Sequence, residues 1–209
     1  MRGLLAAAFV GLALWLALAV AGGLAAAAIF PAAKSLPISL AGFEAFAAER
    51  PEEARVLAAG HLVERVFDLT GLVRCTLGAM ALGALVACAL AVPRVGATSQ
   101  RRTKLVAIAA FVAGVGLACA AVGTFVVQPE FQSQDRAYRD AARAADMVAA
   151  DTLKREVDRS HLAASRTATV EVVAILLAIP LLALGALSFA APGATASAGR
   201  PEGEGARHA

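Results

Sequence analysis

The chain has 209 residues, of which 59% are hydrophobic, 17% charged and 5% aromatic, and its formal net charge is +3. Soluble domains carry about 25% charged residues, so this composition excludes an ordinary soluble domain and a disordered chain. The three cysteines are far apart in the sequence, which excludes a small fold held together by disulfides. With a mean hydropathy of +0.71 the chain is expected to reside in a membrane.

Four long runs are nearly free of charge, and each is long enough to cross a bilayer. A hydrocarbon core of about 30 Å requires about 20 helical residues, because unpaired backbone amides are costly there. The sequence therefore predicts an all-α, polytopic membrane protein with four transmembrane helices that form a bundle with extramembrane helical extensions. The predicted spans are 5–29, 71–92, 105–127 and 168–190.

The first run follows Arg2, as the apolar region of a secretory signal peptide does. It continues without a charge to Phe30, far beyond the roughly 7–15 residues of such a region, so we expect it to be retained as a span. The outer segment 31–70 then opens with turn chemistry at Phe30–Pro31. Farther on, Pro51 and the two acids that follow it are typical of a helix start, and this helix should run into the second span.

The short connection between the second and third spans sets the orientation. Pro93 to Lys104 contains four basic residues and no acid, which places this connection in the cytoplasm by the positive-inside rule. We therefore expect a multi-pass protein of the bacterial inner membrane with both termini cytoplasmic. The segments 31–70 and 128–166 would then lie on the periplasmic side.

The outer segment 128–166 is rich in opposite charges spaced four residues apart, such as Asp135 with Arg139. This spacing predicts a helix almost throughout, with a break near Ala149 to Thr152. The residues from Ala191 to Ala209 are mainly Pro, Gly and small polar residues without periodicity. They predict a disordered cytoplasmic tail.

Short motifs along the chain follow the order found in a known family. They are Ile29-Phe30-Pro31, Leu36-Pro37, Ala59-Gly60, Leu62, Phe67, Val126-Val127, Pro129, His161 and Ser165. Over residues 5–190 the chain resembles the transmembrane-protein-205-like bacterial membrane proteins, a four-helix domain of unknown function. The resemblance implies the four-span architecture and assigns no chemistry. The chain departs from the family pattern in Ser39 to Val56, which resembles an insertion, and in a longer segment before the fourth span.

Two histidines suggest a candidate site at the outer end of the bundle. His61 lies ten residues before Gly71, and His161 lies ten before Glu171, so continuous helices would bring both imidazoles to a similar height. Metal sites in bundles use His and carboxylate pairs at such helical spacing. The candidate metal ligands are His61, Glu64, Asp68, Asp158 and His161. The alternative is an ordinary solvated face, because no motif of fixed ligand spacing is present.

Two charges fall inside the predicted spans, Arg74 and Glu171. A charge in a span requires a partner, an aqueous cavity or a place near the interface. Both residues lie near the outer ends of their spans, so we expect them to pair with each other. A structural salt bridge or snorkelling is one interpretation of this intramembrane pair, and lining a solute path is the other.

These patterns favour a non-enzymatic protein, either a scaffold or a bundle that handles a small solute, and no catalytic residue or cofactor is expected. The alternative is a metal- or haem-dependent membrane enzyme with its site at the outer end. The bilayer is the expected partner, and a second copy of the chain and a periplasmic protein stay open as further partners. Nucleic acid is excluded, because the basic cluster Arg101-Arg102-Lys104 fits a topology signal and lipid headgroups.

Overall fold

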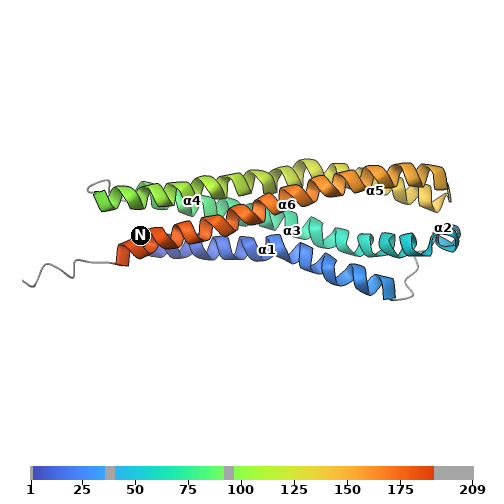
Figure 1. The fold of residues 1–209 in the computed structure, drawn as a ribbon, viewed down its shortest axis with the longest axis horizontal. Helices are drawn as coiled ribbons and strands as arrows, with labels where there is room; N and C mark the ends of the chain where they lie inside the picture. The colour runs from blue at the N-terminus through green and yellow to red at the C-terminus, as the bar shows by residue number, and fades with distance from the viewer. Residues whose placement is uncertain (1, 36–40, 92–96, 191–209) are drawn as a thin grey trace, which may run out of the picture.

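The computed structural model describes residues 2–35, 41–91 and 97–190, and these residues form a long helical bundle (Figure 1). The elements are α1 (Arg2–Ser35), α2 (Glu44–Glu49), α3 (Pro51–Ala91), α4 (Ala97–Val122), the π-helical turn η1 (Gly123–Val127), α5 (Gln128–Arg143) and α6 (Met147–Ala190). Four helical stretches are long and apolar enough to cross a membrane, as predicted. The predicted tail 191–209 and the end of the second span at residue 92 lie outside the described residues.

The helices run up and down the long axis of the molecule, so that chain segments gather at two ends (Figure 1). The start of α1, the end of α3, the start of α4 and the end of α6 lie at one end. The other end holds α2 and the turn between α5 and α6. We call this second end, formed by residues 30–35, 41–68 and 128–166, the polar end. In the bundle α1 packs on α3 and α4 packs on α6, while α3–α4 and α1–α6 contacts close the ring.

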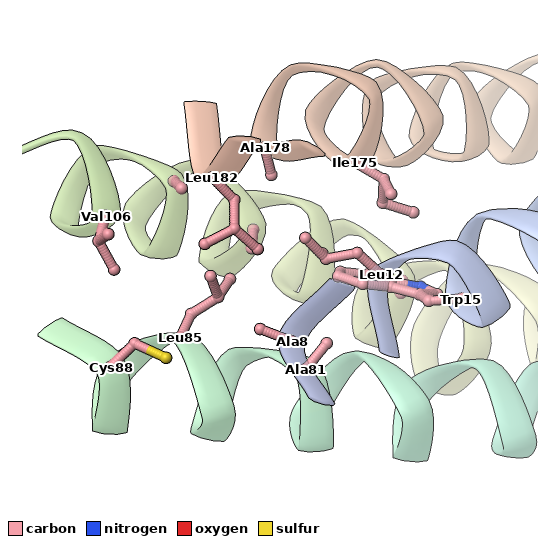
Figure 2. Close-up of a cluster of buried hydrophobic side chains, with 13 residues drawn as sticks. Ala8, Leu12, Trp15, Ala81, Leu85, Cys88, Val106, Ile175, Ala178 and Leu182 are labelled. Carbon is pink, nitrogen blue, oxygen red and sulfur yellow. The ribbon is translucent and has the colours of Figure 1, made fainter. Parts of the chain in front are cut away.

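The core of the apolar part is built mainly from small and branched side chains, which allow the helices to approach closely (Figure 2). Its buried members are Ala8, Leu12, Trp15, Ala81, Leu85, Cys88, Val106, Ala109, Ala113, Ala120, Ile175, Ala178 and Leu182. Large apolar side chains also point outward, among them Leu90 at 70% exposure and Phe111 at 73%. Apolar side chains on both the inner and the outer faces are typical of helices surrounded by lipid.

The first helix continues beyond its predicted end. The turn expected at Phe30–Pro31 is wrong, because α1 passes through Pro31 and ends at Ser35. Proline removes one backbone hydrogen bond and can be accommodated within a helix when neighbours satisfy the freed groups. At the end of α1, Arg55 donates from Nη1 to the carbonyl oxygen of Lys34 at 3.0 Å, which satisfies one of the carbonyls that a helix end leaves open.

The helix predicted to start at Pro51 is confirmed, and α3 continues from there for 41 residues without a break. Its first turn carries Glu52 and Glu53, whose negative charges favour the positive end of the helix dipole. The extension and the second span are therefore one rigid rod. Any group placed along α3 at the polar end has a fixed height above the apolar part.

The helix of the third span continues past residue 127 into the outer segment, where a helix was predicted almost throughout. The helix widens into the π-helical turn at Gly123–Val127 and continues as α5, with Pro129 in its first turn. Proline has no N–H to donate, and its ring collides with the carbonyl four residues earlier, which here belongs to Phe125. The wider turn at η1 relieves this collision, so α4, η1 and α5 form one continuous rod.

The break predicted near Ala149 to Thr152 is wrong, because α5 ends at Arg143 and α6 begins at Met147. Ala145 has a left-handed φ of 53°, and the N–H of Asp146 returns to the carbonyl of Ala141 at 3.0 Å. This is the hydrogen-bond pattern of a Schellman stop. The Asp146 carboxylate then accepts the N–H of Ala149 at 3.0 Å and caps α6. The chain thereby folds α5 back against α6 as a helical hairpin.

Candidate functional site

A buried charge pair joins three helices at the boundary between the apolar part and the polar end. The Nε of Arg74 lies 3.2 Å from Oε1 of Glu171, so the pair expected from the sequence is present. The indole N–H of Trp15 donates to the same oxygen at 2.8 Å. The Glu171 residue is 1% exposed, and the Arg74 side chain is 14% exposed. The carboxylate of α6 is therefore held by a hydrogen bond from α1 and by an ion pair with α3.

Two glycines make the space for the Trp15 ring. A Cβ at Gly78 would lie 3.0 Å from the ring carbons of Trp15, and a Cβ at Gly116 would lie 3.3 Å from them. The indole thus sits against backbone on α3 and α4, which brings its N–H to Glu171. Any larger residue at Gly78 must displace the ring or the helix.

The polar end has its own apolar cluster, separate from that of the spans. Its buried members are Phe43, Phe46, Leu57, Tyr138, Ala142 and Ala150. The rings of Phe46 and Tyr138 meet edge to face at a centroid distance of 6.4 Å. The short helix α2 therefore ties the start of α3 to the α5–α6 hairpin.

Ion pairs hold the hairpin to the start of α3. Arg50 binds Asp151 through both guanidinium nitrogens, one of them at 2.9 Å, and this bidentate geometry is the strongest form of such a pair. The Arg50 guanidinium lowers the pKa of the Asp151 carboxyl. Lys154 lies 3.2 Å from Glu53, whose second oxygen accepts the Tyr138 hydroxyl at 3.3 Å.

Between these helices lies a cavity of about 500 Å³ at the polar end. Four helices contribute to its wall: α1, α3, α5 and α6. Its lining residues are Phe30, Lys34, Glu52, Glu53, Arg55, Val56, Leu57, Gly60, Phe131, Asp135, Tyr138, Lys154, Val157, Asp158 and His161. A Cβ built at Gly60 meets no atom within 4 Å, so the wall is open at this position.

Asp135 and Tyr138 on α5 have perturbed acidity at the cavity wall. Burial raises the pKa of the Asp135 carboxyl; Arg139 opposes this rise and Glu64 adds to it. Burial also raises the pKa of the Tyr138 hydroxyl, and the neighbouring Glu53 carboxylate adds to it. Tyr138 therefore keeps its proton and donates a hydrogen bond to Glu53 over the whole physiological range.

The five predicted metal ligands fall into two groups. His61, Glu64 and Asp68 face α5, away from the cavity wall. Their side chains already have partners: Arg139 lies 2.8 Å from Nδ1 of His61 and donates to Glu64 at 2.8 Å. Gln132 donates to Asp68 at 2.6 Å. A guanidinium can only donate, so Nδ1 of His61 is the acceptor, and a metal ion there would adjoin a cation.

Asp158 and His161 form the second group, and both line the cavity. Within residues 2–35, 41–91 and 97–190, no three His, Cys, Asp or Glu side chains are grouped as metal ligands would be. The five-ligand metal centre therefore stays a prediction. A metal- or haem-dependent enzyme would now depend on Asp158 and His161, the two candidate ligands that line the cavity.

Sequence reasoning missed Trp15, Glu53, Tyr138 and Gly60. The uncharged run around Trp15 contains no signal for its angular position on the helix. Tyr138 is the only tyrosine, and Glu53 precedes Leu57 by one turn, but their meeting depends on where the α5–α6 hairpin reverses. That reversal was predicted several residues too late.

The comparisons with known proteins leave this bundle without a match. No family model fits the chain, and neither a curated protein nor a solved structure is similar to it. The resemblance to the transmembrane-protein-205-like proteins accordingly rests on the sequence motifs alone. The function must be argued from the cavity and the charges around it.

Proposed function

We propose that this protein is a multi-pass protein of the bacterial inner membrane that binds a small solute in the cavity at its polar end and catalyses no reaction. The observation that carries the proposal is the cavity of about 500 Å³ between α1, α3, α5 and α6. Ligand pockets in proteins are about 300–1,000 Å³ in volume, with mainly apolar walls and a few polar groups. A protein that served only as a scaffold would have no need of such a space.

The charge pattern supports a periplasmic position for this cavity. The basic residues Arg101, Arg102 and Lys104 lie in the first turns of α4, and α4 starts at the end of the bundle opposite the polar end. Basic residues in a short connection favour the cytoplasmic side, so the polar end faces the periplasm and both termini are cytoplasmic. A periplasmic protein that delivers or accepts the solute, or a second copy of this chain, would be the natural partner.

The proposal is tested by filling the cavity without unfolding the protein. Gly60→Leu places a side chain where the wall is open, and replacing a helical glycine should stabilise α3 by up to about 1 kcal/mol. Gly83→Leu is the matched control, because a Cβ at Gly83 also meets nothing within 4 Å but lies on an exposed face far from the cavity.

The measurement is the thermal midpoint of the full chain in lipid nanodiscs against amino acids, dipeptides, sugars, organic cations and organic anions at millimolar concentration. A class that raises the midpoint of the wild type and of Gly83→Leu, but not that of Gly60→Leu, supports the proposal. If no class shifts the wild type, or if Gly60→Leu responds equally, the cavity is not a solute site.

A further inference from the structure

We infer that the solute is a zwitterion, with an ammonium and a carboxylate on one apolar body, as in a short peptide. This inference rests on the proposed function. It starts from the charged side chains of the cavity wall, which fall into two sets. One set is already paired: Glu53 binds Lys154 and the Tyr138 hydroxyl, and Asp135 binds Arg139.

The second set has charges left over. Among the described residues the Lys34 ammonium and the Asp158 carboxylate have no hydrogen bond or ion pair, and neither has the Glu52 carboxylate. Arg55 uses only Nη1, to reach the carbonyl of Lys34. The other guanidinium nitrogens of Arg55 can still receive an anion.

These unpaired charges are divided between two parts of the cavity wall, one formed by α1 and α3 and the other by α6. Lys34 and Arg55 stand on α1 and α3, where Glu52 is the one unpaired acid of the described lining, so the unpaired charge of these two helices is net positive. Asp158 stands on α6, three residues before His161. The four charges of the second set sum to zero, so a neutral ligand with separated charges matches them better than a net cation or a net anion does.

The rest of the wall fits an apolar body between the two charged groups. Phe30 and Phe131 contribute rings from opposite walls, and Val56 and Val157 contribute branched side chains. Together with the volume of about 500 Å³, this lining suits a dipeptide with apolar side chains.

Zwitterionic lipid headgroups share the same charges, but the height of the cavity favours a dissolved ligand. Gly60 precedes Arg74 by fourteen residues on the unbroken α3, a rise of about 21 Å. Arg74 is about 26 Å from the end of α3 at Ala91. With Ala91 at one boundary of a 30 Å hydrocarbon core, Arg74 lies close to the other boundary. A headgroup layer is only about 5–8 Å thick, so the cavity lies beyond it.

The inference is tested with three matched probes: leucylleucine, its amide, which lacks the carboxylate, and its N-acetyl form, which lacks the ammonium. Affinities are measured by titration calorimetry on the full chain in phosphatidylglycerol nanodiscs. The wild type should bind leucylleucine about tenfold or more tightly than either blocked form, because each blocked form loses one charge-assisted contact.

Two variants should each remove one of these two affinity differences and keep the other. Asp158→Asn should lose the advantage of leucylleucine over the N-acetyl form and keep its advantage over the amide. Lys34→Gln should do the reverse. Both residues are exposed at the wall without ion pairs, so both variants should keep the wild-type thermal midpoint, which serves as the folding control.

The possible failures can be told apart. Equal affinities for the three probes, or tighter binding of one blocked form, would overturn the zwitterion while leaving a solute site that Gly60→Leu abolishes. No binding of any solute, with no effect of Gly60→Leu, would overturn the proposed function itself. Loss of leucylleucine binding in phosphatidylethanolamine nanodiscs would show that a lipid headgroup occupies the cavity and would overturn the dissolved ligand.

Discussion

Glu171 is a single carboxylate on which three helices converge. Its Oε1 accepts the Trp15 N–H and lies 3.2 Å from Arg74. Two charges so close to the apolar part are stable only together, because removal of one leaves the other buried without a partner. These contacts therefore fix the heights of α1, α3 and α6 relative to one another. Because the pair lies near the boundary between the apolar part and the polar end, a structural role is sufficient to explain it.

Removal of Arg74 should test this dependence. Arg74→Leu leaves Glu171 unpaired and should lower the free energy of unfolding by about 3–5 kcal/mol. The double variant Arg74→Leu/Glu171→Gln should lose clearly less, because the neutral amide oxygen still accepts from Trp15. Unfolding in mixed micelles can be followed by the fluorescence of Trp15, the single tryptophan. Equal losses in the single and double variants would contradict the pairing.

At the scale of whole elements, Trp15 is held by the close approach of α3 and α4. Gly78→Ala adds a Cβ at 3.0 Å from the indole and from Leu117 Cδ1, so the indole or Leu117 must shift by a few tenths of an ångström. We expect a loss of about 1–3 kcal/mol in unfolding free energy and a changed Trp15 emission maximum. Gly83→Ala, which meets open space, should change neither; if both variants behave alike, the ring is not wedged there.

The Arg50–Asp151 pair makes the docking of the hairpin depend on pH. The folded protein lowers the pKa of Asp151, so the pair stabilises the fold above the ordinary aspartate value of about 3.9. This contribution is lost as the pH falls through the still lower folded value. Asp151→Asn should therefore have a lower thermal midpoint than the wild type at pH 6, and this difference should shrink as the pH is lowered below the ordinary aspartate value. A difference that persists undiminished at low pH would contradict the pair's role.

How far the sequence predicts this structure differs between elements. The four spans and the start of α3 at Pro51 were predictable, because charge-free runs and helix-start residues are local signals. The ends of the helices were not predictable from local signals. Pro31 indicated a turn, but a helix can contain a proline, as α1 does at Pro31, or widen into a π-helical turn ahead of one, as α4 does before Pro129.

The reversal between α5 and α6 had one usable signal, which was overlooked. Asp146 caps the N–H of Ala149, but the residue before it is Ala145, where glycine normally marks a left-handed stop. Because the reversal sets where α6 starts relative to α5, the misplaced break also affected the predicted site. His61 contacts Arg139, whereas His161 contacts Phe131, eight residues earlier on α5. The similar height of the two imidazoles therefore stays a prediction.

At the scale of the whole molecule, the bundle places one charged end and one cavity on the same side of the membrane. Val148, 80% exposed near the hairpin turn, should be periplasmic. In a chain whose cysteines at 75, 88 and 119 are replaced by alanine, Val148→Cys should react with an impermeant maleimide on cells whose inner membrane is intact. Arg101→Cys should react only after that membrane is permeabilised. The opposite pattern would place the cavity in the cytoplasm.

The proposed function requires that a small solute binds between the four helices at the polar end. Hydrogen–deuterium exchange of the full chain in nanodiscs, with and without leucylleucine, tests it most directly. We predict slower exchange confined to residues 30–34, 52–60, 131–138 and 154–161, which line the cavity, and no change in Gly60→Leu. Protection that is absent, or that appears around Arg74 and Glu171 instead, would contradict the claim.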